Sequence, residues 1–279
     1  MLWLVPYTNA TTADYTTWWL QIGELASHTR GLSVAASAYA LKHDGSFGYA
    51  DTSAGEPDGG QEMEQYGMPA LRRFGVTLLG MCYFTHGDGI AIVLSNPQPF
   101  IDQVIQKVIA QNLSGMDLDY EPQQVAAAER ALAARHAEHP GSAAPVSFPS
   151  FLALLAEALA AAGGFVLTID GEGGAPGSCA SIPCSDYAKI KNLLSVNTMD
   201  TFNIRDVKGF QGMLATDLPV LGEKWAPGFE PANLISVWGD IVQAAIAGNV
   251  TQITSWACYE WNTQPQPQGL IDGIAAFLT

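Results

Sequence analysis

The chain has 279 residues, of which 48% are hydrophobic and 14% are charged, enough apolar material for one large core. Its formal net charge of −15, from 27 acidic and 12 basic residues, would repel a nucleic-acid backbone or an anionic membrane, so we expect neither as a partner. No apolar run approaches the roughly 20 residues needed to cross a bilayer, and residues 1–6 are too short for the apolar part of a secretion signal.

Short β-rich apolar runs alternate with helical patterns along the whole chain, which is typical of a parallel sheet covered by helices. The predicted strands are, in chain order, Leu2–Tyr7, Leu32–Tyr39, Gly75–Phe84, Gly115–Tyr120, Phe165–Asp170, Leu194–Met199, Leu218–Gly222 and Thr251–Trp256. Eight β/α rounds in this length favour a closed (β/α)8 TIM barrel, formed by residues 1–279 as a single α/β domain. An open doubly wound sheet would usually carry a glycine-rich phosphate loop after its first strand, and Pro6-Tyr7-Thr8-Asn9 is not one.

Apolar residues at helical spacing predict helices over Pro97–Gln111, Pro149–Ala162 and Pro231–Ala247. Two segments interrupt the alternation. Residues 43–60, rich in Gly, Asp and Ser, predict a long loop after the second strand, and residues 125–145 predict an inserted polar helix after the fourth. Both would lie at the rim where barrel enzymes bind substrates, although simple solvated spacers fit these compositions equally well.

The fourth predicted strand carries carboxylates at every second position, Asp117, Asp119 and Glu121. Strand side chains alternate between faces, so the three acids point together while their apolar neighbours face the helices. Burying three acids opposes folding, which indicates a function. We expect Glu121, nearest the strand's end, to have a raised pKa and to act as a general acid. An exposed acidic edge strand is the alternative, but it leaves the apolar neighbours unexplained.

The run Ser-Gly-Met-Asp-Leu-Asp-Tyr-Glu at residues 114–121 resembles the D-G-x-D-x-D-x-E signature of glycoside hydrolase family 18, the chitinases and endo-β-N-acetylglucosaminidases. Residues 253–257 and 196–200 are similar to the family's strand-8 and strand-6 regions. The resemblance implies substrate-assisted retaining catalysis on a TIM barrel. In that mechanism Glu121 is the acid and later the base, Asp119 binds the acetamido N–H and stabilises the oxazolinium ion, and Asp117 shares a proton with Asp119.

By the same resemblance, Trp256 would stack on the sugar ring, with further contacts from other strand ends. The expected substrate-binding residues are Trp256, Asp200, Met199, Tyr7, Asn203 and Trp225, the last of which could equally be a packing residue. The sequence departs from the family pattern at three places, one of them the glycine-rich strand-3 motif, where Leu79-Gly80-Met81 stands. Ser114 stands where the family has its first aspartate, which we expect to remove one charge from deep in the barrel. The family's strand-6 tyrosine is missing near Thr201 and Phe202.

Other polar residues follow predicted strands and could reach the rim. Asp170 and Glu172 follow the fifth strand, and His86 and Asp88 follow the third; substrate contact and a solvated loop fit equally. No second His or Cys lies at ligand spacing, so we expect no metal site and no cofactor. The loop pair Cys179 and Cys184 could close a disulfide.

The sequence therefore predicts a chitinase-like glycoside hydrolase whose partner is an N-acetylglucosamine-containing glycan, either chitin or an N-linked core. Two alternatives remain. A non-catalytic lectin is consistent with the altered strand 6, and a hydrolase of sugars without the acetamido group would use Asp119 as a nucleophile about 5.5 Å from Glu121. The family resemblance also favours secretion.

Overall fold

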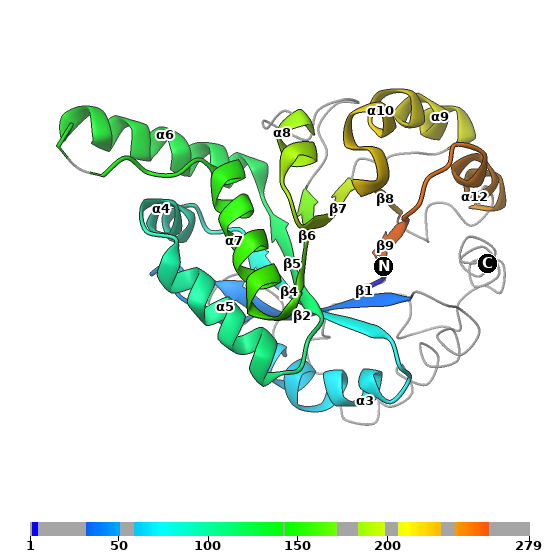
Figure 1. Ribbon diagram of the computed structural model, residues 1–279, viewed down its shortest axis with the longest axis horizontal. Coiled ribbons are helices and arrows are strands. Elements are labelled where there is room, and N and C mark those ends of the chain that lie inside the picture. The colour runs from blue at the N-terminus through cyan, green and yellow to red at the C-terminus, as the bar shows by residue number, and fades with distance from the viewer. Residues whose placement is uncertain are drawn as a thin grey trace.

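The strands form one closed, mainly parallel barrel in the computed structural model, which describes residues 2–4, 32–50, 59–141, 143–171, 184–198, 206–229 and 238–256 (Figure 1). The nine-stranded sheet runs in the order β1-β9-β8-β7-β6-β5-β4-β2-β3. β1 also pairs with β2 in parallel, and this pairing closes the ring. Only β3 is antiparallel among the described strands, so the predicted TIM barrel is confirmed.

The strands are β1 (Leu2–Leu4), β2 (Ser33–Leu41), β3 (Phe47–Tyr49), β4 (Thr77–Phe84), β5 (Gly115–Tyr120), β6 (Val166–Gly171), β7 (Leu193–Thr198), β8 (Trp225–Phe229) and β9 (Thr254–Trp256). The helices are α2 (Gly60–Glu62), η2 (Met63–Gly67), α3 (Met68–Arg72), α4 (Gly87–Ser95), α5 (Gln98–Ala110), α6 (Pro122–Glu138), α7 (Phe148–Gly163), α8 (Cys184–Lys189), α9 (Val207–Thr216), α10 (Leu218–Leu221), η4 (Gly222–Lys224) and α12 (Trp238–Ala247). Among the described residues, no helix combines the length and the hydropathy that a membrane span requires.

The seventh strand was predicted in the wrong place. Residues 218–221 form the helix α10, with Pro219 in its first turn, and the strand β8 follows at Trp225–Phe229. Proline fixes a backbone angle that suits a first helical turn, whereas the true strand contains Pro and Gly, which sequence patterns exclude from strands. The predicted loop over residues 43–60 is also partly wrong, because β3 pairs with β2 there.

Predicted helices agree well with the structure where it describes them. α5 and α7 lie within one residue of the predicted Pro97–Gln111 and Pro149–Ala162, and α12 covers the second half of 231–247. The inserted helix also exists, but as α6 it begins directly after β5 and projects beside α4 from the barrel (Figure 1). The insertion therefore starts at the mouth of the barrel.

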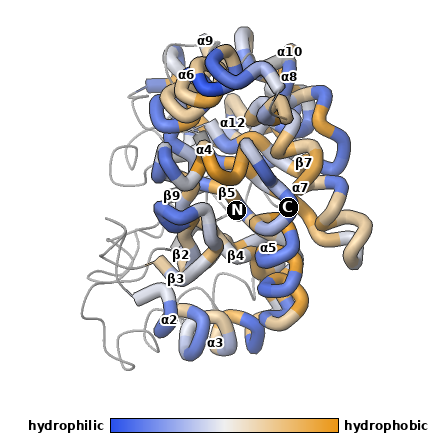
Figure 2. Tube along the Cα trace, turned by 90° about the vertical axis from the view of Figure 1, so that its left-hand side faces the viewer, coloured by the Kyte–Doolittle hydropathy of each residue, from blue (hydrophilic) through white to orange (hydrophobic). Residues whose placement is uncertain are grey.

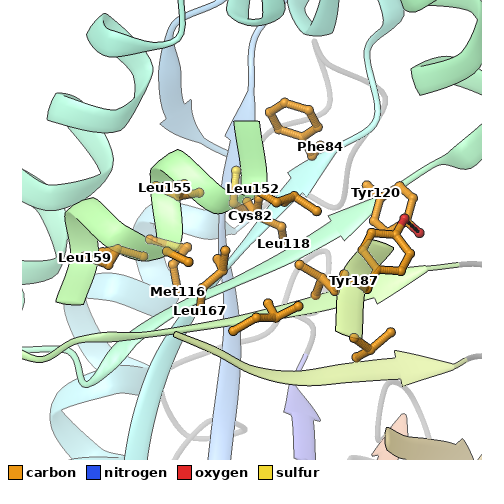
Figure 3. Close-up of a cluster of buried hydrophobic side chains, with 14 of the residues drawn as sticks. Cys82, Phe84, Met116, Leu118, Tyr120, Leu152, Leu155, Leu159, Leu167 and Tyr187 are labelled. Atoms are coloured by element: carbon orange, nitrogen blue, oxygen red, sulfur yellow. Dashed lines mark hydrogen bonds between the residues drawn. The ribbon is translucent and has the colours of Figure 1, made fainter. Parts of the chain in front are cut away.

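Two apolar clusters hold the barrel together. The larger cluster lies between strands and helices, where Met116 and Leu118 of β5 pack against Leu152, Leu155 and Leu159 of α7 (Figure 3). Hydrophobic segments accordingly gather around β5 and α7, and hydrophilic segments lie toward the outer helices (Figure 2). The smaller cluster is inside the barrel and consists of Ala35, Ala40, Ala50, Leu79, Met81 and Tyr83.

A carboxylate fastens the β2–β3 hairpin to the helices. Glu64 of η2 accepts hydrogen bonds from the hydroxyls of Tyr39 and Tyr49, both at 2.7 Å, and from Lys107 Nζ at 3.0 Å. Gln111 Nε2 donates a fourth bond at 3.0 Å. Burial alone would raise the pKa of Glu64, but these donors and the Lys107 charge hold it below its usual value.

Candidate active site

The acids of β5 occupy the alternate positions that the sequence predicts. Asp117 is fully buried, and Asp119 and Glu121 are half-buried. The intervening Met116, Leu118 and Tyr120 belong to the outer apolar cluster. A Cβ at Gly115, on the acids' side of the strand, would lie 2.1 Å from the Val166 carbonyl oxygen, so glycine allows β5 and β6 to approach there.

Strand register arranges the barrel interior in layers. One layer joins Met81, Asp117, Thr168 and Ser195 from β4, β5, β6 and β7. The next layer toward the strands' carboxyl ends joins Tyr83, Asp119, Asp170, Asn197 and Ala226. Active sites of such barrels lie at this carboxyl end. Strands β4 to β8 thus place two layers that contain polar side chains beneath Glu121.

Asp117 is held by donors from the neighbouring strands. The hydroxyl of Thr168 donates to Asp117 Oδ1, and Asn197 Nδ2 donates to the same oxygen at 3.5 Å. The Asn197 carbonyl oxygen in turn accepts from the Ser195 hydroxyl at 3.2 Å. Hydrogen bonds of this kind favour the ionised form of a buried carboxyl group.

Asp170 lies inside the barrel rather than on the rim, which corrects its predicted position. It is the fifth residue of β6, pairs in register with Asp119 and is fully buried. Neither of its carboxyl oxygens has a hydrogen-bond partner among the described residues. Burial, and then the negative charges of Asp117 and Asp119, raise the pKa of Asp170 well above its ordinary value. The site thus contains a fourth acid that the sequence assigned to the loop.

Glu121 stands where β5 becomes α6. Its backbone remains extended, with φ −92° and ψ 108°, so its side chain keeps the alternation of the strand. Its carbonyl oxygen accepts the N–H groups of Gln124 and Val125, both at 3.0 Å, and Pro122 occupies the first helical turn. These bonds fix the backbone that carries the predicted acid.

Ser114 does not lie where the resemblance implies. It precedes β5, is exposed to solvent, and its carbonyl oxygen accepts the Val166 N–H at 3.0 Å. The expected loss of a charge deep in the barrel is therefore wrong, because an acid at residue 114 would lie outside the interior layers.

A polar cluster on the rim joins two loops that are distant in sequence. The rings of His43 and His86 stack with centroids 4.3 Å apart, and His43 Nδ1 lies 2.8 Å from a carboxylate oxygen of Asp88. Burial alone would raise the pKa of Asp88, but hydrogen bonds from His43 and from the Gly89 N–H lower it below its usual value. Sequence reasoning missed His43, since it follows β2 and meets the other two only through the fold. Among the described residues no group of His, Cys, Asp or Glu could hold a metal ion.

Trp225 is not available as a sugar platform, so its predicted substrate contact is wrong. It begins β8, is fully buried and stacks on Phe210 of α9 at 6.0 Å. Its indole N–H donates to Thr198 Oγ1 at 3.0 Å. In register Trp225 lies beside Val196 in the outward-facing row, so it packs between the barrel and α9.

The remaining predicted contacts lie outside the described residues. These are Tyr7, Met199, Asp200 and Asn203, together with Glu172 and the proposed partner Cys179 of Cys184. Trp256 is described only in its backbone, as the last residue of β9, where it pairs with Trp3 of β1. It therefore ends a barrel strand, as the resemblance implies, at the same end as Glu121.

Solved structures share this architecture. A chitinase from Chromobacterium violaceum is 12% identical, with 100% of this chain and 98% of that chain covered and a TM-score of 0.65. The chain has a chitinase-like fold. A family 18 chitinase from Pseudoalteromonas aurantia is 12% identical over 99% of both chains, with a TM-score of 0.64. The spore cortex-lytic enzyme SleL from Bacillus cereus is 12% identical, with 100% and 74% covered and a TM-score of 0.66.

No protein-family model and no curated protein matches the sequence. Likeness at this identity establishes the chitinase-like barrel alone. The family resemblance drawn from residues 114–121 is thereby supported at the level of the fold.

Proposed function

We propose that the protein is a retaining glycoside hydrolase that cleaves β-1,4-linked N-acetylglucosamine glycans such as chitin. The observation that carries the proposal is the row of Asp117 and Asp119 on β5 and Glu121 directly after it, in a closed chitinase-like barrel. A fold accepts so many acids in its interior only where they serve a function, since burial and mutual repulsion both oppose their ionisation.

Each acid has a distinct role in this proposal. Glu121, outermost on its strand, protonates the glycosidic oxygen, and the substrate's acetamido oxygen attacks the anomeric carbon. The bond to the leaving group breaks as the oxazolinium ring closes, and Glu121 then takes a proton from the attacking water. Asp119 accepts the acetamido N–H and stabilises the positive ring, while Asp117 supports it from the layer beneath. Trp256, Asp200, Met199, Tyr7 and Asn203 complete the sugar site.

A lectin is the second candidate, and the sequence of strand 6 favours it. No tyrosine lies near Thr201 and Phe202, where chitinases of this family supply a phenol to the acetamido group. A lectin on this barrel would bind N-acetylglucosamine oligomers through the same residues without turnover. The retained Glu121 supports the enzyme, because a binding protein has no need for an acid at that position.

Hydrolysis of a chromogenic N-acetylchitobioside, by wild type and by Glu121→Gln, separates the two candidates. For the enzyme we expect turnover that falls at least about a hundredfold in the variant, because glutamine cannot supply the proton. The matched control is Glu138→Gln at the far end of α6, which should leave turnover unchanged. Binding of chitin oligomers by both proteins without turnover in either would identify the lectin. Absence of both turnover and binding would refute the proposed function.

A further inference from the structure

The interior acids of this barrel are treated unequally by their surroundings. Asp117 and Asp170 are both fully buried, one layer apart. Asp117 accepts hydrogen bonds from Thr168 and Asn197, whereas Asp170 accepts none among the described residues. Two buried carboxyl groups so close together cannot both be ionised without a large electrostatic cost. The question is therefore which of them carries a proton.

Hydrogen-bond donors place the negative charge on Asp117. A hydroxyl and an amide both donate to the same oxygen, and donors stabilise a carboxylate more than a neutral acid. Thr168 is 1% exposed and Asn197 is 1% exposed, so water does not compete for these bonds. A proton on Asp117 would weaken the bond from Thr168 and the longer bond from Asn197.

The surroundings of Asp170 favour the neutral form. Asp117 and Asp119 face it from β5, and Ser195 and Asn197, which face it from β7, are uncharged. The register-matched residues of the two layers include no Lys, Arg or His. With no donor to it among the described residues, an ionised Asp170 would thus be a buried anion beside two others, a costly arrangement that protonation removes.

We propose that Asp170 carries the proton of this acidic group and is a positioning residue that donates a hydrogen bond to Asp119. A neutral acid has one O–H to donate, and its register partner Asp119 presents a half-buried carboxyl group on the adjacent strand. The bond forms when the Asp119 side chain turns toward β6. It fixes that carboxylate while leaving its second oxygen for the substrate, a role that rests on the proposed function.

The protonation state can be observed without any substrate. In infrared spectra at neutral pH, a protonated carboxyl group gives a C=O band that is distinct from the bands of carboxylates. Because Glu121 also holds a proton as the general acid, the test uses Glu121→Gln as its background. We expect the band in Glu121→Gln, its loss when Asp170→Asn is added, and its persistence when Asp117→Asn is added instead. Asp102→Asn, on the exposed side of α5, is the matched control and should leave the band unchanged. Absence of the band in Glu121→Gln, or its loss on adding Asp117→Asn but not Asp170→Asn, would overturn the proposal.

Kinetics test the positioning role. Asp170→Asn keeps a neutral donor of nearly the same shape, so kcat should stay within about threefold of wild type. Asp170→Ala removes the donor and should lower kcat about a hundredfold, with KM changed far less, because Asp119 is misplaced in the transition state. Equal kcat values in Asp170→Ala and wild type would overturn the role. A protein that shows the Asp170 band but neither cleaves nor binds chitin oligomers would instead refute the proposed function.

Discussion

Replacing Thr168 with valine removes the hydroxyl that donates to the buried Asp117 carboxylate, while preserving the shape of the side chain. Both residues are almost fully buried, so no water can replace the donor. A hydrogen bond to a charged group contributes about 1.5–3 kcal/mol. The 3.5 Å bond from Asn197 remains but is long, so it compensates little. We expect Thr168→Val to lower the free energy of unfolding by about 2 kcal/mol.

The assay is urea unfolding followed by tryptophan fluorescence at pH 7, with the midpoint and slope compared between variants. Thr77→Val is the matched control, because Thr77 begins β4 with its side chain exposed and should change stability by less than about 0.5 kcal/mol. Equal stability of Thr168→Val and Thr77→Val would contradict the expected contribution of the Thr168 hydroxyl. That result would mean that Asp117 does not depend on Thr168, and the assignment of its charge would lose its main support.

Two further predictions concern residues outside the acidic layers. Glu64→Gln should destabilise the protein most near pH 7. The pKa of Glu64 is lower in the folded state than in the unfolded state, where it is near 4.5. The ionised carboxylate therefore stabilises the fold fully above pH 4.5, and this stabilisation is lost as the pH falls through the lower folded pKa. Urea midpoints of Glu64→Gln and wild type, measured from pH 7 to about pH 2.5, should therefore converge toward the acid end, and a constant difference would contradict the role of Lys107 and the tyrosines. Trp225→Phe should cost about 2 kcal/mol of stability, since packing on Phe210 is reduced and the bond to Thr198 is lost. Calorimetric titration with chitin oligomers should give the same Kd for Trp225→Phe and wild type. A larger Kd for the variant would show that Trp225 contacts the sugar.

The most predictable part of the molecule is β5, whose bounds and alternation follow from the sequence alone. A two-residue period of acids and apolar residues determines which face meets the helices, because one face must join the outer core. Residues 218–229 show the limit of this reasoning. Leu218–Leu221 has the composition of a strand but follows Asp217 and contains Pro219, and it forms a helix. Local composition could not decide there, because pairing with β7 and β9 selects Trp225–Phe229 as the strand.

Asp170 shows why part of the site could not be read from one sequence. The predicted strand ends at this residue, and the sequence predicts that Asp170 reaches the rim together with Glu172. Its depth is instead set by register: Asp170 pairs with Asp119, which lies two residues before Glu121. A shift of β6 by one residue would turn the carboxyl group out of the barrel, and a shift by two would bring it level with Glu121 or with Asp117. No pattern within residues 165–171 encodes that choice, since it depends on how β6 lies between β5 and β7. The number of acids inside this barrel, and therefore the location of their shared proton, is a property of the assembled sheet.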